Sequence, residues 1–294
     1  MSAQGPEPRP TTTPRSVMAL IDDAAPRLTS SERRVAAAIL DDPQVVAFGT
    51  VAQLATRSGS SGPTVLRFAA KLGFDGFVEL QAAVQEEIAD RLRPATQRIR
   101  ERRPTDVLGR VLAADLDNVR RTLEAVDAAE FQAAVELLAD RRASVFVLAS
   151  TISSPVGAAL ATQLDLLRDG VVAIGGSPLQ VARDLVRVQP DDVVVAIDVR
   201  RYERWVLDAL ERVHGRGARV IALTDSRLSP LAAGAKHTFI SDARGVGPFD
   251  SAVGALTLVH AFGAAVAARL RRSATGRLDA VEAAWNHGAH LVDG

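Results

Sequence analysis

Five short runs of apolar residues constrain the fold of this chain more than any other feature. They are SVFVLAS (144–150), VVAIGG (171–176), DVVVAID (192–198), ARVIALTD (218–225) and HTFIS (237–241), and helix-like stretches separate them. Continuous runs rich in Val and Ile are typical of strands that are buried on both faces of a parallel sheet. Because crossovers between parallel strands are right-handed, the pattern predicts a five-stranded parallel sheet in a three-layer αβα sandwich.

A different pattern lies between Leu54 and Gly76, where the chain reads LATRSGSSGPTVLRFAAKLGFDG. Gly59 suits the left-handed residue that ends a helix, and Ser61 is a good N-cap for a second helix with Pro63 in its first turn. This succession of helix, tight turn and helix is the layout of a helix-turn-helix DNA reader. Two amphipathic helices of an ordinary bundle give the same pattern, so the residues alone leave both interpretations open.

The second helix of this pair carries polar side chains beside its apolar stripe. We expect Val65, Phe68, Ala69 and Leu72 to form its buried face. The N-terminal end of such a helix usually meets base edges, and basic residues farther along reach bases or phosphates. The candidate DNA-binding residues are therefore Ser61, Thr64, Arg67 and Lys71.

Several short groups of residues stand in a characteristic order and at characteristic spacings between Leu28 and Gln81. In chain order they are Leu28-Thr29, Glu32, Asp42-Pro43, Leu54-Ala55, Ser61, Thr64-Val65, Arg67-Phe68, Lys71-Leu72-Gly73-Phe74 and Gly76-Phe77. In this order they resemble the N-terminal domain of RpiR-type transcriptional regulators. The resemblance implies a reading helix from about Ser61 to Leu72 that enters the major groove of DNA.

The second half of the chain carries a further resemblance, over residues 128–270. Its most specific part is VIALTDSRLSPLAAGAKHTFI (220–240), and Ser251 with the helix behind it also fits. This half resembles the sugar isomerase (SIS) domain, the usual partner of the RpiR-type reader. In that domain, hydroxyl-bearing loops after the first and second strands hold a sugar phosphate. Carried over by position, Ser153 and Ser154 match the first loop, and Thr224 borders the site.

The second loop departs from the family's Ser-x-Ser-Gly-x-Thr pattern, because this chain has the run DVRRYE (198–203) there. Asp198 would repel a phosphate placed against it. Arg200 or Arg201 would offset that charge and bind a carboxylate or phosphate bidentately. Alternatively, both arginines form ion pairs with Asp198, Glu203 or a dimer partner. Ligands of such sheets bind beyond the carboxyl ends of the strands, so the predicted ligand-binding residues are Ser153, Ser154, Arg200, Arg201 and Thr224.

Length and charge narrow the class of protein. The chain has 294 residues, a natural length for two domains. Its 35 basic and 35 acidic residues give a net charge of zero, so DNA binding would need a local basic patch. The chain has no cysteine, which excludes disulfides and thiolate metal sites. No window approaches roughly 18 uninterrupted apolar residues, so no membrane span is expected and the cytoplasm is the predicted compartment.

Shifts in composition predict the organisation of the chain. The expected segments are a disordered tail (1–15), a helix-turn-helix DNA-binding domain (16–93), an Arg-rich linker and helix (94–127), an SIS-like ligand-binding domain (128–272) and a C-terminal tail (273–294).

Three kinds of function are compatible with this organisation. The first is a DNA-binding transcriptional regulator whose SIS-like domain senses a small anionic metabolite, a sugar phosphate or a carboxylate. The second is an SIS-type sugar phosphate isomerase with a helical appendage, and the third is a non-catalytic scaffold. An isomerase needs an acid or base within reach of the substrate carbon, and the five histidines show no catalytic spacing. We therefore predict a regulator, not an enzyme, with no cofactor and no metal.

The partners that this interpretation predicts are double-stranded DNA, the small anionic effector and a second copy of the chain. One helix-turn-helix unit buries too little surface for tight specific binding, so such readers usually act as symmetric pairs on an inverted repeat. We expect a homodimer or homotetramer. The apolar helix at residues 252–268 is broad enough to pack on a partner as well as on its own sheet.

Overall fold

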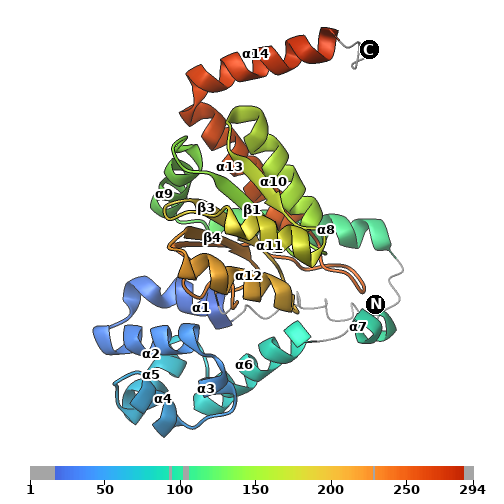
Figure 1. The fold of residues 1–294 in the computed structure, drawn as a ribbon. Coiled ribbons are helices and arrows are strands. Elements are labelled where there is room, and N and C mark those ends of the chain that lie inside the picture. Colours follow the sequence, from blue (N-terminus) through green and yellow to red (C-terminus); the bar gives the residue numbers. More distant parts are fainter. Residues whose placement is uncertain (1–16, 93–94, 102–105, 228, 288–294) are drawn as a thin grey trace, which may run out of the picture. The chain divides into compact units, whose positions relative to one another are not determined.

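The structure is a computed structural model that describes residues 17–92, 95–101, 106–227 and 229–287. The chain divides into two compact units, Met1–Asp90 and Arg91–Gly294 (Figure 1). The predicted tail at residues 1–15 lies outside the described residues.

Helices build the first unit. They are α1 (Val17–Ala24), the 3-10 turn η1 (Ala25–Arg27), α2 (Ser30–Asp41), α3 (Gln44–Ala47), α4 (Val51–Arg57), α5 (Gly62–Lys71) and α6 (Phe77–Leu92). Capping boxes start two of them. The Thr29 hydroxyl accepts a hydrogen bond from the Glu32 backbone N–H at 3.4 Å, and the Glu32 carboxylate accepts one from the Thr29 N–H at 2.8 Å. Thr50 and Gln53 repeat this arrangement at α4, so both helix starts are encoded locally.

The predicted buried face of α5 is confirmed. Val65, Phe68 and Ala69 are fully buried, and Leu72 is nearly so. α5 contacts α2 and α4, and Val35, Ile39, Leu54 and Leu80 of the other helices are also fully buried. Apolar burial of this kind is the main stabilising contribution to a small helical unit.

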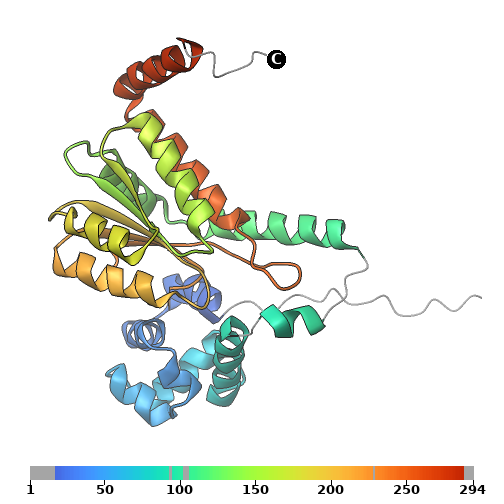
Figure 2. The ribbon, with the colours of Figure 1, turned by 45° about the vertical axis from the view of Figure 1, so that its right-hand side comes forward.

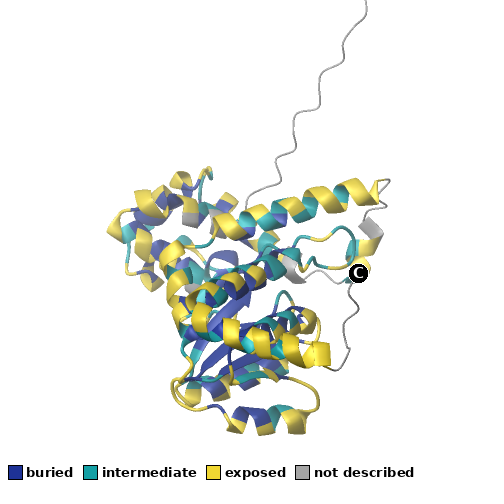
Figure 3. Ribbon diagram, turned by 90° about the horizontal axis from the view of Figure 1, so that it is seen from above, coloured by how far each residue is buried: buried dark blue, intermediate teal, exposed yellow. Residues whose placement is uncertain are grey.

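A five-stranded parallel sheet forms the centre of the second unit, as the sequence predicts. Its strands are β1 (Val145–Ala149), β2 (Val171–Ile174), β3 (Val193–Ile197), β4 (Arg219–Thr224) and β5 (His237–Ile240). Their order is β2-β1-β3-β4-β5, and all neighbouring pairs are parallel. The inner strands β1, β3 and β4 are the dark blue, buried centre of the unit in Figure 3, whereas the edge strands β2 and β5 are only partly buried. Every carboxyl end in such a sheet points to the same edge, which is where loop residues can meet.

Helices cover both faces of this sheet and complete the αβα sandwich (Figure 2). One face packs against α11 (Pro178–Val186) and α12 (Arg204–Gly215). The other packs against α9 (Ala128–Ala139), α10 (Ser154–Leu167) and α13 (Val253–Arg269). Val145 and Val147 point to the second layer, whereas Phe146 and Leu148 point to the first, as the alternation of strand side chains requires.

The described part of the second unit contains three further helices, which are not part of the two helical layers. The predicted linker contains α7 (Ala95–Glu101) and α8 (Val107–Glu124), and residues 102–105 are outside the described part of the chain. α8 packs on α13, and α14 (Arg271–His287) contacts α10. The predicted C-terminal tail is therefore helical as far as His287.

The apolar side chains of α13 are covered by the unit itself. Leu258, Val259 and Phe262 are buried, and the Phe262 ring stacks on Phe131 with centroids 4.9 Å apart. The expectation that this helix offers a broad apolar face to a partner is wrong, because α8, α9 and α10 already occupy that surface.

No single helix in the described part of the chain is long and apolar enough to cross a membrane, although the bent pair α13 and α14 reaches that length and composition together.

Candidate functional site

The turn between α4 and α5 is a Schellman motif. Gly59 has a φ of 56°, the Ser60 N–H donates to the Ala55 carbonyl at 2.9 Å, and the Gly59 N–H donates to the Thr56 carbonyl at 3.2 Å. The left-handed glycine expected at this position is confirmed, because a side chain at this φ would be strained. The motif fixes the direction in which α5 leaves α4.

An arginine on α2 holds the same turn from outside. Arg34 donates from Nε to the Ser58 carbonyl at 3.3 Å and from Nη2 to the Gly59 carbonyl at 3.2 Å. Its guanidinium thereby satisfies carbonyls that the end of α4 leaves without helical partners. Sequence reasoning missed Arg34, because nothing in the spacing of residues along the chain links it to a turn 24 positions away.

Three of the four predicted DNA-binding residues form a short polar chain on the first turns of α5. The Ser61 and Thr64 hydroxyls lie 2.9 Å apart, and Arg67 Nη2 donates to the Thr64 hydroxyl at 3.2 Å. Ser61 and Arg67 are exposed, but Thr64 is only 6% exposed. Ser61 stands at the N-cap position without capping the helix through its side chain. In this arrangement Thr64 orients Arg67 from beneath.

Lys71, the fourth residue, is engaged elsewhere. Its Nζ lies 2.7 Å from Glu32 Oε2 and 3.0 Å from the Arg27 carbonyl. The hydrogen bond from Lys71 and those from Thr29 lower the pKa of the buried Glu32 carboxyl below its ordinary value of 4.5, against the opposing effect of burial. Lys71 therefore ties α5 to α2, and its side-chain bonds go to Glu32 and Arg27, whereas Thr64 joins Ser61 and Arg67.

The exposed face of α5 contains one apolar residue that the sequence did not single out. Leu66 is 47% exposed beside Arg67, with Pro63 and Ala70 on the same face. Apolar side chains on a reading helix can contact thymine methyl groups in the major groove. Its position next to an arginine gives the face both kinds of group that read base edges.

At the carboxyl edge of the sheet, the loop after β1 has its own hydrogen-bond pattern. The buried Ser150 hydroxyl accepts from the Ser153 N–H at 3.2 Å, and the Ser154 hydroxyl donates back to the Thr151 carbonyl at 2.8 Å. Ser153 is buried and Ser154 exposed. Neither hydroxyl caps α10, although Ser153 stands at its N-cap position.

The second of the two predicted ligand loops, residues 198–203, follows β3, which is the third strand in chain order and not the second, and it starts on a buried carboxylate. Asp198 accepts hydrogen bonds from the Val199 and Glu203 backbone N–H groups, both at 2.9 Å. Burial raises the pKa of Asp198, and hydrogen bonds from Glu203, Ser150 and Val199 offset only part of that effect. The carboxylate thus links the loop after β1 to the start of α12.

Between Asp198 and Glu203, the two predicted ligand-binding arginines have left-handed backbones. The φ angles are 42° at Arg200 and 43° at Arg201, a conformation that costs energy for residues with side chains. Arg200 Nε lies 3.2 Å from Asp250 Oδ1, whereas Arg201 is exposed. The ion pair considered for Arg200 is therefore present, and it includes Asp250, a partner that the sequence did not suggest.

Asp225 lies where the β3 and β4 loops meet. Its Oδ1 accepts from the Tyr202 hydroxyl at 2.9 Å, and from the Arg200 N–H and the Thr224 hydroxyl at 3.4 Å each. Thr224 is fully buried. The structure thus brings Arg200 and Thr224 to one carboxylate, which the sequence analysis did not identify.

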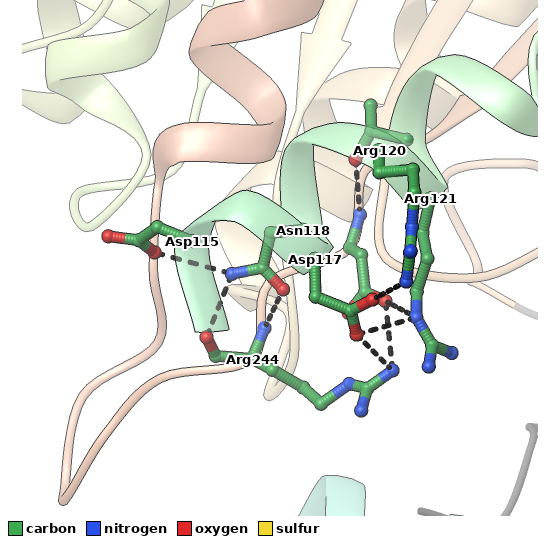
Figure 4. A network of polar contacts seen from close by, with 8 residues as sticks. Asp115, Asp117, Asn118, Arg120, Arg121 and Arg244 are labelled. Atoms are coloured by element: carbon green, nitrogen blue, oxygen red, sulfur yellow. Dashed lines mark hydrogen bonds and ion pairs between the residues drawn. The ribbon is translucent and has the colours of Figure 1, made fainter. Parts of the chain in front are cut away.

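The loop that carries Asp250 is fastened to α8 (Figure 4). Asn118 is fully buried, donates from Nδ2 to the Arg244 carbonyl at 2.8 Å, and accepts from the Arg244 N–H at 3.2 Å. The Ser251 hydroxyl donates to Asp115 Oδ1 at 2.6 Å. These bonds hold both ends of residues 244–251, so Asp250 is presented on a fixed loop.

Charge pairs reinforce the same junction. Arg121 Nε lies 2.7 Å from Asp117 Oδ2, and Arg244 Nη2 lies 3.6 Å from the same oxygen. Burial alone would raise the pKa of Asp117, but hydrogen bonds and charges from Arg120, Arg121 and Arg244 outweigh it and lower the pKa. Asp117 therefore remains a carboxylate at neutral pH and holds the arginines in place.

Asp250 also meets the segment that follows the first unit in the chain. Arg98 of α7 donates from Nη1 to Asp250 Oδ1 at 2.6 Å, the same oxygen that Arg200 approaches. One carboxylate therefore joins α7 to the loop after β3. Among the described residues, no group of three or more His, Asp or Glu side chains is placed to hold a metal ion.

Comparison with known proteins identifies both halves of the chain. Residues 16–91 match the helix-turn-helix domain of the rpiR family, and residues 137–265 match the SIS domain. The chain belongs to the RpiR family of transcriptional regulators. The family predicted from the sequence is confirmed. RpiR-type regulators are DNA-binding proteins, so the helix-turn-helix interpretation holds over the ordinary bundle.

Curated relatives agree with this assignment over most of their length. The HTH-type transcriptional regulator HexR of Pseudomonas aeruginosa is 26% identical over 223 residues, which cover 74% of this chain and 76% of HexR. An uncharacterized HTH-type transcriptional regulator of Caldanaerobacter subterraneus is 25% identical over 248 residues, covering 83% of this chain and 87% of the relative. The chain is therefore a DNA-binding transcriptional regulator and not an enzyme, and the isomerase alternative is not supported.

Solved structures show the same fold. The sugar isomerase domain of the RpiR transcription factor from Sphaerobacter thermophilus is 32% identical, with a TM-score of 0.56, and the match covers 60% of this chain and 99% of that domain. The Vibrio vulnificus NanR protein, solved in complex with ManNAc-6P, is 21% identical with a TM-score of 0.55 over 95% of this chain and 100% of NanR.

The Glu32–Lys71 pair generates a pH-dependent prediction. Because the pKa of Glu32 is lowered in the folded state, the pair stabilises the first unit above about pH 4.5, and this stabilisation is lost as the pH falls through the folded pKa. We expect Glu32→Gln to lower the free energy of unfolding by about 1–3 kcal/mol at pH 7, with a smaller difference from the parent at lower pH. Calorimetric scans of the parent and the variant at a series of pH values from 7 downward measure this difference in the free energy of unfolding. Glu86→Gln, at an exposed carboxylate of α6, is the control. A difference that stays constant with pH would contradict the assignment.

Proposed function

We propose that this RpiR-type regulator senses a small acidic metabolite at the carboxyl edge of its SIS-domain sheet and changes its operator affinity in response. The acidic group is a phosphate or a carboxylate. We further propose that the regulator acts in the cytoplasm as a homodimer or homotetramer on an inverted repeat. Two copies present two reading helices, and symmetric readers match operators of this kind.

The observation that carries this proposal is the shared carboxylate of Asp250. Its Oδ1 pairs with Arg98 on α7 and with Arg200 on the loop after β3. An acidic ligand that draws Arg200 away leaves Asp250 to Arg98 alone and changes how α7 is held. Since α7 follows the DNA-binding unit in the chain, the ligand then biases the placement of that unit.

The ligand complex of a neighbour supports the class of effector. NanR was solved with ManNAc-6P, a phosphorylated sugar, and it shares the fold of this chain. Among the five candidate ligand residues, Ser154 and Arg201 are exposed and Arg200 is partly exposed, so we propose these three for direct contact. The buried Ser153 and Thr224 act behind them by fixing the two loops.

On the DNA-binding unit, we propose Ser61 and Arg67 as direct contacts, because both are exposed on α5. Thr64 supports Arg67 through its hydroxyl. Lys71 reaches a phosphate only by giving up part of its pairing with Glu32, so its contribution is electrostatic.

For the dimer, we propose the outer face of α8. Leu108 is 83% exposed, and Leu112 and Leu116 are each 62% exposed, one helical turn apart. Val107 and Val111 extend the same stripe. An 18-residue helix is about 27 Å long, so a second copy of α8 packed along it would bury a continuous apolar seam. A two-fold axis through this seam makes each copy supply the same surface.

The DNA proposal is tested at Arg67. Arg67→Ala removes one charge-assisted contact, worth roughly 1–3 kcal/mol if it pairs with guanine, so operator affinity should fall about ten-fold or more. Fluorescence anisotropy measures this affinity, with DNA taken from the region upstream of the gene that encodes the chain. Arg27→Ala, which removes an exposed charge from η1, is the matched control. Unchanged operator binding by a folded Arg67→Ala protein would refute the assignment.

The coupling proposal is tested at Asp250. Asp250→Asn weakens both arginine pairs, as the ligand would weaken one, so the unliganded variant should differ from the parent in operator affinity by about 5–150-fold. The variant should also respond less to any acid that alters DNA binding by the parent. Asp208→Asn, at an exposed position on α12, serves as the control. An Asp250→Asn protein with the parent's operator affinity and response would exclude this relay.

The dimer proposal is tested by placing a charge in the seam. Leu112→Glu should convert the dimer into a monomer at micromolar concentration, because burying an unpaired carboxylate is costly. Sedimentation velocity measures the mass, and Leu278→Glu on α14 provides a comparison at another partly exposed leucine. A monomeric parent protein, or a Leu112→Glu variant that stays dimeric, would rule out this surface.

A further inference from the structure

Glu203 stands at a helix start but does not cap it. It occupies the N-cap position of α12, where its side chain makes no capping hydrogen bond. Instead Oε1 accepts from the Thr151 backbone N–H and Oε2 from the Thr151 hydroxyl, both at 3.0 Å. The Trp205 indole N–H also donates to Oε2. The carboxylate therefore reaches from the start of α12 to the loop after β1 and accepts hydrogen bonds from Thr151 of that loop and from Trp205 of α12.

The two bonds from Thr151 form a fork. An N–H and an O–H of one residue meet the two oxygens of one acid, which is the arrangement that a free carboxylate or a phosphate would also adopt. Glu203 thus fills a position suited to an oxyacid. Asp198 lies next to it, since Asp198 accepts the Glu203 backbone N–H. A second acid brought to Thr151 would be repelled by both carboxylates unless Glu203 moved away.

We infer that Glu203 is an internal competitor for acidic ligands at Thr151 and thereby determines which acids this regulator binds. The inference rests on the proposed function, because it concerns the effector of the same edge of the sheet. A phosphate or carboxylate reaches the two Thr151 donors only by displacing Glu203. Acids that make further contacts, for example with Arg200 or Arg201, can do so, whereas a simple anion cannot.

Inorganic phosphate is the probe for this inference, titrated into the full-length protein without DNA. The parent should bind it weakly. Glu203→Gln removes the competing charge at the same side-chain length, and the phosphate dissociation constant should fall at least ten-fold. Phosphate should also raise the melting temperature of the variant more than that of the parent. Glu211→Gln, at an exposed carboxylate of the same helix, should behave as the parent does.

A second variant covers a loss of folding in the first. Glu203→Thr supplies a residue that caps a helix well and cannot reach Thr151. It should gain phosphate binding in the same way. Adding Thr151→Val to either variant removes the hydroxyl donor and should abolish most of the gain. Acetate tested alongside distinguishes a carboxylate site from a phosphate site.

Two results would overturn the inference. In one, the parent and both Glu203 variants bind phosphate equally. In the other, the gain persists when Thr151 is replaced. Because no DNA is present, failure of effector control over operator binding would leave this result unaffected, so the two proposals are judged separately.

Discussion

The buried carboxylate of Asp198 organises the carboxyl edge of the sheet. Taking a charged group out of water is costly unless hydrogen bonds replace those of water, and here the Val199 and Glu203 backbone N–H groups supply them, with Ser150 beside them. Those same bonds fix the ends of the loop between Asp198 and Glu203. The left-handed backbones of Arg200 and Arg201 persist because the loop is held at both ends.

The sequence predicts the elements of this fold well, and for a clear reason. Strands that are buried on both faces are almost continuously apolar, so β1 (VFVLA), β3 (VVVAI) and the centre of β4 (VIAL) stand out in the sequence. The buried face of α5 follows from the helical period, and Gly59 from the backbone conformation that its turn requires. Each of these signals is local.

The partners of the site residues are not predictable in the same way. Arg200 pairs with Asp250, which is distant in the sequence and lies on a loop that Asn118 and Ser251 hold in place. On a helical wheel Lys71 lies on an open face of α5, but in the structure its ammonium group forms an ion pair with Glu32 of α2. Contacts of this kind depend on how distant elements pack, which residue spacing does not encode. Glu203 differs from these residues, because the sequence itself shows that it stands where the family pattern has a threonine.

Shared use of one oxygen makes Asp250 more than a structural link. Arg98 and Arg200 both approach Oδ1, so a stronger bond to one draws the oxygen away from the other. The carboxylate is partly buried, which leaves its ion pairs less screened than those on the open surface. In the function that we propose, an event at Arg200 reaches α7 across two contacts, without a long chain of rearranged side chains. Two contacts are enough in this proposal, because the ligand acts on the same segment of chain that follows the DNA-binding unit.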